Sequence, residues 1–150
     1  MSVVLAVSTV TVVGLMVGVE LAVAFVVHPM TLRLPTAASL AARADGARVM
    51  GRAMPFWYIG SLVLTAVLTV LLWGTPAATA TLVAVLLLTV GIVMSVVLLV
   101  PINDRSATWT ADDHPADWRQ QQQRWDRLHY VRVVIIVAAF VLVTVGAAMR

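Results

Sequence analysis

The chain of 150 residues contains no cysteine and no lysine, and Glu20 is its single glutamate. Without cysteine there can be no disulfide exchange, no iron–sulfur cluster and no thiolate-ligated haem. Without lysine, every fixed positive side chain is an arginine guanidinium. Only 11% of the residues are charged and 61% are hydrophobic, which excludes an ordinary soluble domain. No nucleic-acid-binding motif accompanies the arginines, so we expect no nucleic-acid partner.

Four long hydrophobic runs make up most of the chain. They cover residues 3–27, 56–73, 77–100 and 131–148. Each has about 18 residues or more, enough to cross a hydrocarbon core of about 30 Å. Backbone groups in lipid must bond within their own segment, so each run is predicted to be a helix. The predicted fold is all-α, a single integral membrane domain over residues 1–150 built as a four-helix bundle in a lipid bilayer.

The first run is expected to remain as a span rather than to be removed as a secretory leader. No basic residue precedes it, and it is longer than the hydrophobic part of a typical leader.

Arginine placement predicts the orientation of the four spans. The polar loops 28–55 and 103–130 lie on one side of the membrane and hold eight of the ten arginines, whereas Arg150 alone lies on the other side. Because cytoplasmic loops carry an excess of arginine and lysine, both long loops are predicted to be cytoplasmic. Both termini are then extracytoplasmic, and the protein is expected in the cytoplasmic membrane.

Helical segments are also predicted inside the two polar loops. Residues 36–50 are rich in alanine and lack proline, which predicts a short interfacial helix that ends near Pro55. In the second loop, Pro115 followed by Ala-Asp-Trp118 is typical of a helix start. That helix is expected to continue for about 30 residues into the last span. No internal repeat is evident in the sequence.

Glu20 lies inside the first span, about two helical turns from His28 or roughly 10–12 Å along the axis. An ionisable side chain at that depth is unfavourable unless it is paired or hydrated, and it marks a candidate functional site. Its predicted partner is Arg132, one turn into the fourth span from the same side. A purely structural ion pair and a catalytic carboxylate both remain open.

The polar segment 103–132 holds three of the five tryptophans and five of the ten arginines, more than a connector needs. Within it, Trp125, His129 and Arg132 follow one another at helical spacings of four and three, so they share one stripe. An indole, an imidazole and a guanidinium can stack on a planar aromatic, accept its proton and hold the resulting anion. The alternative is an aromatic belt with arginines reaching the membrane surface.

Other polar residues at the same membrane surface allow further interpretations. Asn103 and Arg105 either clamp a substrate or only cap the helix and mark the boundary. His28 and His129 could complete a two-histidine, one-carboxylate metal site with Glu20, or one of them could ligate a haem. An interfacial histidine is more often a hydrogen-bonded boundary residue, so no metal or organic cofactor is predicted. Small residues at Gly14-x-x-x-Gly18 and Gly91-x-x-x-Ser95 predict close helix packing, internal or in a homo-oligomer.

Four segments together resemble the anthrone oxygenase-like family of small four-helix membrane proteins, also called the DUF1772 family. These are Val27-His-Pro, Gly51-Arg-Ala-Met-Pro-Phe-Trp-Tyr58, Pro101-Ile-Asn-Asp-Arg105 and Trp125-Asp-Arg-Leu-His-Tyr-Val-Arg132. The resemblance covers nearly the whole chain. It implies oxygenation of a hydrophobic polycyclic aromatic polyketide, as in antibiotic biosynthesis, with dioxygen as co-substrate and without an obvious organic cofactor.

The resemblance also implies roles for the candidate residues. His129 would be the base, Arg132 and Arg105 would bind the oxyanion, and Glu20 would orient His129 or Arg132 or receive the proton. The residues expected to contact the substrate further include His28, Arg52, Trp57, Asn103, Trp109 and Trp125. The competing hypotheses are a non-catalytic membrane carrier or assembly protein, and a metal or haem oxidoreductase that uses His28 and His129.

Overall fold

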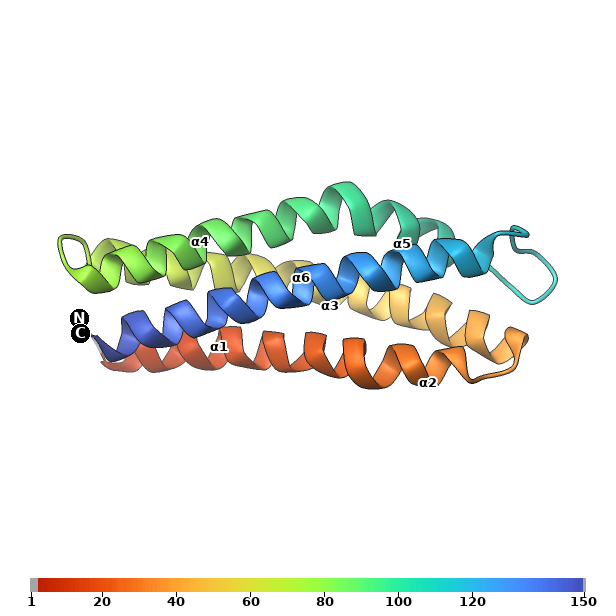
Figure 1. Ribbon diagram of the computed structural model, residues 1–150, viewed down its shortest axis with the longest axis horizontal. Helices are drawn as coiled ribbons and strands as arrows, with labels where there is room; N and C mark the ends of the chain where they lie inside the picture. The colour runs from red at the N-terminus through yellow and green to blue at the C-terminus, as the bar shows by residue number, and fades with distance from the viewer. Residues whose placement is uncertain (1–2, 150) are drawn as a thin grey trace.

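The computed structural model describes residues 3–149, which form helices and connecting turns without a β-strand. The helices form four long rods in chain order (Figure 1). The first and third rods each contain three successive helical segments, and the second and fourth rods are single long helices. The elements in chain order are α1 (Val3–Ala22), η1 (Val23–Val27), α2 (His28–Leu32), α3 (Thr36–Leu71), α4 (Pro76–Met94), η2 (Ser95–Leu99), α5 (Val100–Ser106) and α6 (Trp118–Ala148).

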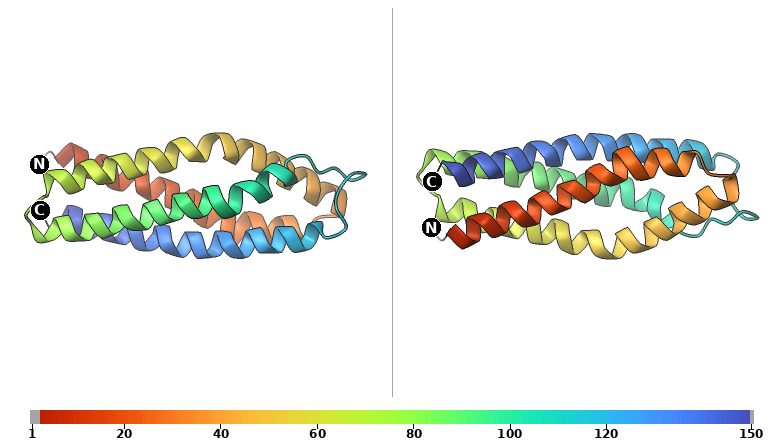
Figure 2. Two further views of the ribbon diagram at one scale, coloured as in Figure 1. Left: turned by 90° about the horizontal axis from the view of Figure 1, so that it is seen from above. Right: turned by 90° about the horizontal axis from the view of Figure 1, so that it is seen from below.

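The four rods form a closed bundle. α6 packs against α1 and α4, and α3 packs against the same two helices from the opposite side. The described chain begins and ends at one end of the bundle, and the connections between α2 and α3 and between α5 and α6 lie at the other, arginine-rich end (Figures 1 and 2). All four rods are long and apolar enough to cross a membrane. The predicted four-helix membrane fold is confirmed.

Two predicted helices have different outcomes. The helix expected from Trp118 is confirmed, since α6 runs for 31 residues to Ala148. The separate interfacial helix at residues 36–50 is wrong, because those residues are the first turns of α3, which continues through Pro55 to Leu71. Proline removes one bond, to the carbonyl of Gly51 four residues earlier, and a long helix packed between neighbours tolerates that loss.

The segments η1 and η2 are single π-helical stretches, each of which directly precedes an X-Pro pair. His28 N–H bonds to the carbonyl of Val23, and Val100 N–H bonds to that of Ser95, five residues back in each case. A proline ring clashes with the carbonyl four residues before it, and the wider turn relieves this crowding at Pro29 and Pro101. The second set lies 72 residues after the first. The same combination of a π-helical turn and a following X-Pro pair therefore occurs once in the first half of the chain and once in the second.

Small residues bring α6 close to its neighbours. A Cβ added at Gly146 would lie 2.5 Å from Thr81 Cγ2, one at Gly91 would lie 3.4 Å from Ile136, and one at Gly14 would lie 3.0 Å from the Phe140 ring. The packing role predicted for Gly14 and Gly91 is confirmed inside the bundle. Apart from its chain neighbours and the adjacent backbone of its own helix, no described atom lies within 4 Å of a Cβ built at Gly18.

Candidate functional site

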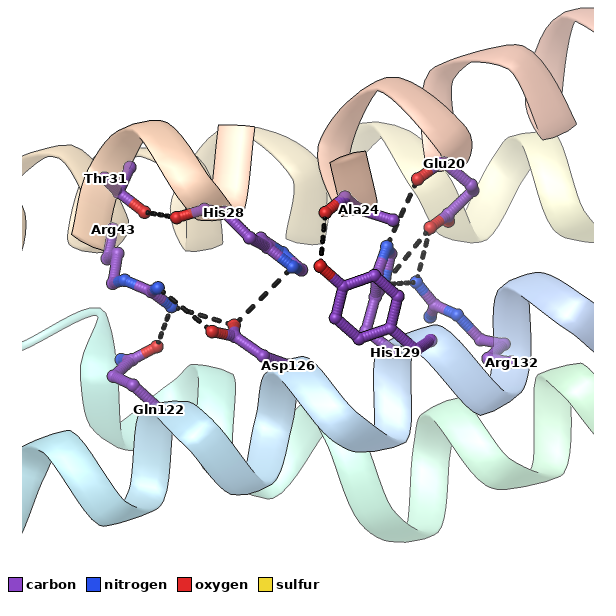
Figure 3. Close-up of polar contacts among 10 residues, drawn as sticks. Glu20, Ala24, His28, Thr31, Arg43, Gln122, Asp126, His129 and Arg132 are labelled. Carbon is purple, nitrogen blue, oxygen red and sulfur yellow. Dashed lines mark hydrogen bonds and ion pairs between the residues drawn. The ribbon is translucent and has the colours of Figure 1, made fainter. Parts of the chain in front are cut away.

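The site begins at Glu20, which is 2% exposed in the middle of the bundle. Its Oε2 accepts a hydrogen bond from Arg132 Nη2 at 2.7 Å, and its Oε1 accepts one from the Tyr58 hydroxyl at 2.9 Å. The predicted pairing of Glu20 with Arg132 is confirmed (Figure 3). A buried carboxylate needs such partners because burial without them is strongly unfavourable.

His129 is 1% exposed and lies beside this ion pair. Its Nδ1 is 3.0 Å from Arg132 Nη2, and its Nε2 is 3.3 Å from the backbone carbonyl of Glu20. A guanidinium only donates hydrogen bonds and a carbonyl only accepts them. Nδ1 also lies 3.4 Å from Glu20 Oε2, and its shorter contact with Arg132 assigns it as the acceptor. Nε2 then carries the proton, so both ring nitrogens are engaged within the protein.

Trp125 and Arg132 complete the stripe predicted on α6. The Trp125 ring is stacked on the His129 ring, with centroids 4.9 Å apart and planes 11° from parallel. Arg132 Nη1 donates to Ser95 Oγ at 2.8 Å, at the start of η2. Two buried donors, Trp125 Nε1 and Arg132 Nε, have no hydrogen-bond partner within residues 3–149. Unpaired buried donors are unfavourable, and an oxygen atom of a bound molecule would satisfy them.

These groups line a cavity of about 190 Å³ within the bundle. Most of the lining is apolar, from Val19 and Val23 on the first rod, Met50, Met54 and Ile59 on α3, and Ile92, Val96 and Leu99 on the third rod. The polar lining residues are Glu20, Tyr58, Ser95, Asn103, Trp125, His129 and Arg132. Ile59 and Val96 are 55% and 61% exposed, so the cavity reaches the outer apolar surface of the bundle.

A second polar network lies next to the cavity, toward the arginine-rich end. Arg43 binds both oxygens of Asp126, at 3.0 and 3.2 Å, and donates to Gln122 Oε1 at 2.7 Å. His28 Nδ1 is 3.6 Å from Asp126 Oδ1, and the His28 ring packs edge-on against the His129 ring at 4.8 Å. Figure 3 shows the two networks side by side along α6, with the His28 side chain directed toward Asp126.

Half of the ten predicted site residues line the cavity: Glu20, Asn103, Trp125, His129 and Arg132. His28 does not line the cavity, but its ring packs against the rings of Trp125 and His129, which do.

The other four predicted residues lie outside the cavity. Arg52 and Arg105 are on the exposed surface. Trp57 donates instead to the carbonyl of Val12 at 3.0 Å, and Trp109 packs with Leu40 and Trp118 beside a different cavity. The structure does not bring these four residues to the cavity. For Trp57 the reason is that adjacent residues on a helix point about 100° apart, and Tyr58 is the one that lines the cavity.

Sequence reasoning missed Tyr58, Ser95 and Asp126. Tyr58 immediately follows Trp57, and it is Tyr58 that faces the bundle interior. Asp126 lies three residues before His129, the same spacing that placed Arg132 on one stripe with His129. The sequence marked Ser95 as part of a small-residue pair with Gly91. That pair predicted close helix packing and not a hydrogen bond to Arg132.

The arrangement of the candidate ligands bears on metal binding. In the described part of the chain, no group of three or more histidine, aspartate or glutamate side chains is placed to hold a metal ion. The Glu20 oxygens bond to Tyr58 and Arg132, and His28 faces Asp126, so the arrangement of Glu20, His28 and His129 required for a metal site is not formed.

One family comparison gives a match. The family model described as anthrone oxygenase matches residues 53–142, which is more than half of the chain. The matched segment contains Tyr58, Asn103, Trp125, His129 and Arg132, whereas Glu20 lies before it. No curated protein and no solved structure matches the chain.

Proposed function

The chain belongs to the anthrone oxygenase family, and we propose that it is a membrane-embedded oxygenase for a hydrophobic polycyclic aromatic of the anthrone type. The substrate would enter the cavity from the bilayer and react there with dioxygen. The protein would lie in the cytoplasmic membrane with its arginine-rich end in the cytoplasm, as the distribution of arginines favours.

The observation that carries this proposal is the Glu20–Arg132 ion pair in the wall of an apolar cavity. The methylene group of an anthrone is acidic because its anion is delocalised over two rings and the carbonyl oxygen. Glu20 takes this proton and becomes neutral, and the substrate anion replaces it as the partner of Arg132. Total charge in the cavity does not change, so the step avoids leaving a buried charge unpaired.

The unpaired donors of the site are suited to the same anion. Within residues 3–149, Arg132 Nε–H and Trp125 Nε1–H have no hydrogen-bond partner, and both residues line the cavity, so a substrate oxygen that reaches these donors can accept from them as its negative charge develops. His129 was expected to be the base, but its Nδ1 lone pair already accepts from Arg132. We therefore assign proton acceptance to Glu20 and assign His129 the role of orienting Arg132.

The overall reaction balances with dioxygen as the sole oxidant. A methylene group and O2 give a ketone and one molecule of water. The carbon loses four electrons, and one oxygen atom enters the quinone while the other leaves in the water. The electron pair of the anion forms a bond to dioxygen, and the resulting carbon-bound peroxide takes back the proton held by Glu20 to become a hydroperoxide. Glu20 is then again a carboxylate paired with Arg132, and the hydroperoxide loses water. The residues of this chain supply the base, the counter-charge and the apolar slot.

The test supplies an anthrone and dioxygen to membranes that contain wild type, Glu20→Gln or Thr89→Ala. Thr89 is exposed on α4 and bonds only to the carbonyl of Val85, so it is a matched control. General-base catalysis contributes about 10²–10⁴-fold, so quinone formation by Glu20→Gln should fall by about that factor. Wild type no faster than the spontaneous oxidation would overturn the proposal. Anthrone binding without oxygen uptake would favour the carrier hypothesis.

A further inference from the structure

We infer that Tyr58 is a further catalytic residue, which gives its hydroxyl proton to the oxygen that leaves as water. The inference rests on the proposed function and concerns its second half, the breakdown of the hydroperoxide. Neither the sequence pattern nor the family match assigns Tyr58 a role.

Tyr58 is held between the two charged groups of the site. It is 5% exposed and lines the cavity, and its hydroxyl donates to Glu20 Oε1 at 2.9 Å. The Arg132 guanidinium lies over its ring, 5.3 Å from the centroid. The hydroxyl is therefore fixed at the cavity wall beside the carboxylate proposed to take the substrate proton.

The other polar lining groups are less suited to proton donation. The Ser95 hydroxyl donates to the carbonyl of Gly91 at 2.7 Å and accepts from Arg132. The His129 Nε2–H is directed to the backbone carbonyl of Glu20 at 3.3 Å. Asn103, Trp125 and Arg132 offer N–H groups, which hold their protons more tightly than a phenol does. Among the polar residues that line the cavity, Tyr58 alone has an O–H bonded to a carboxylate that can restore its proton.

The step follows from this contact. In the hydroperoxide, Glu20 removes the remaining hydrogen of the carbon as a proton, and the electron pair of that C–H bond forms the C=O bond. The O–O bond breaks, and the departing oxygen, which already carries one hydrogen, receives the Tyr58 proton and leaves as water. Glu20 then returns its proton to Tyr58 across the 2.9 Å hydrogen bond. Atoms and electrons balance, and both residues regain their starting states.

The chain provides a matched control for this inference because it contains two tyrosines. The Tyr130 hydroxyl donates to the backbone carbonyl of Ala24 at 2.7 Å, and Tyr130 does not line the cavity. Tyr58→Phe and Tyr130→Phe each remove one hydroxyl and keep the ring, so the contact of ring 58 with Arg132 survives.

The experiment measures oxygen consumed and quinone formed by the same membranes, with hydroperoxide trapped by triphenylphosphine. Tyr58→Phe should still consume oxygen, but its rate of quinone formation from the hydroperoxide should fall by about 10²-fold, as expected for loss of a general acid. Trapped hydroperoxide should accumulate. Tyr130→Phe should convert all consumed oxygen to quinone, as wild type does.

The outcomes separate the two proposals. If wild type neither consumes oxygen nor forms quinone above the spontaneous rate, the proposed function fails. If wild type turns over and Tyr58→Phe keeps the wild-type ratio of quinone to oxygen, the role of Tyr58 alone is overturned. If Tyr58→Phe does not accumulate in membranes, a single turnover of wild type in D2O replaces it. More hydroperoxide should then be trapped than in H2O, and an equal amount would refute proton donation.

Discussion

Glu20 is stable in this bundle because its partners come from two other helices. Arg132 on α6 and Tyr58 on α3 donate hydrogen bonds to its two oxygens. The Arg132 guanidinium also donates to Ser95 and His129. Removing one member of a buried ion pair typically destabilises a protein by about 3–5 kcal/mol. A residue-level test of function should therefore use substitutions that keep shape and change one polar atom.

Trp125→Phe is such a substitution. It keeps a ring that can stack on His129 and removes the unpaired Nε1–H at the cavity. Because that N–H is proposed to bind the oxygen on which negative charge develops, kcat and kcat/KM should fall together while KM changes little. One hydrogen bond of about 0.5–1.5 kcal/mol corresponds to a roughly 2- to 12-fold decrease in kcat.

Steady-state kinetics on Trp118→Phe provide the control for Trp125→Phe. Trp118 is buried with Leu40 and Trp109, away from the cavity. Its variant should keep the wild-type kcat per folded molecule. An unchanged kcat in Trp125→Phe would show that its N–H does not bind the oxygen on which charge develops.

At the scale of elements, the two π-helical turns place the polar residues of the site. Glu20 lies one turn before η1, and Ser95 is the first residue of η2. π-Helical turns are frequent at functional sites because they rotate the residues around them relative to a regular helix. The prolines at 29 and 101 are visible in the sequence, but the choice between a kink, a break and a wide turn depends on the surrounding helices. Hydropathy alone could not predict it.

Gly146 tests the packing of α6 on α4. A Cβ there would lie 2.5 Å from Thr81 Cγ2 and 3.2 Å from the carbonyl oxygen of Ala77. Thr81 is fully buried, and its β-branched side chain has little freedom to move. Gly146→Ala should therefore lower stability by about 1–3 kcal/mol, seen as a lower Tm of the purified protein in detergent.

Gly60→Ala is the matched substitution in α3. Apart from its chain neighbours and the adjacent backbone of α3, no described atom lies within 4 Å of a Cβ at that position. Alanine loses less backbone freedom than glycine in a helix, so this variant should match or exceed the wild-type Tm. Equal Tm values for the two variants would contradict the close approach of α4 and α6.

For the whole molecule, hydropathy and charge predicted the architecture well. Four apolar runs predicted four spanning helices, and the depth of Glu20 together with the position of Arg132 predicted their ion pair. What they could not give is the rotation of each helix about its own axis. That rotation turns Tyr58 inward and Trp57 toward Val12, and it leaves Arg105 outside the cavity. It depends on the packing of all four helices together.

The exposure of Ile59 and Val96 at the cavity rim has a kinetic consequence. A site entered from the bilayer responds to the mole fraction of substrate in lipid, not to its concentration in bulk water. Fusing the membranes with substrate-free lipid dilutes the substrate in two dimensions and should raise the apparent bulk KM in proportion to the added lipid.

The same KM expressed as a mole fraction should stay constant, which initial rates at several lipid-to-protein ratios would measure. A bulk KM independent of lipid would instead indicate entry from water through the arginine-rich end. If the mole-fraction KM stays constant, the membrane is both the solvent of this protein and the phase in which the substrate concentration that sets the rate must be expressed.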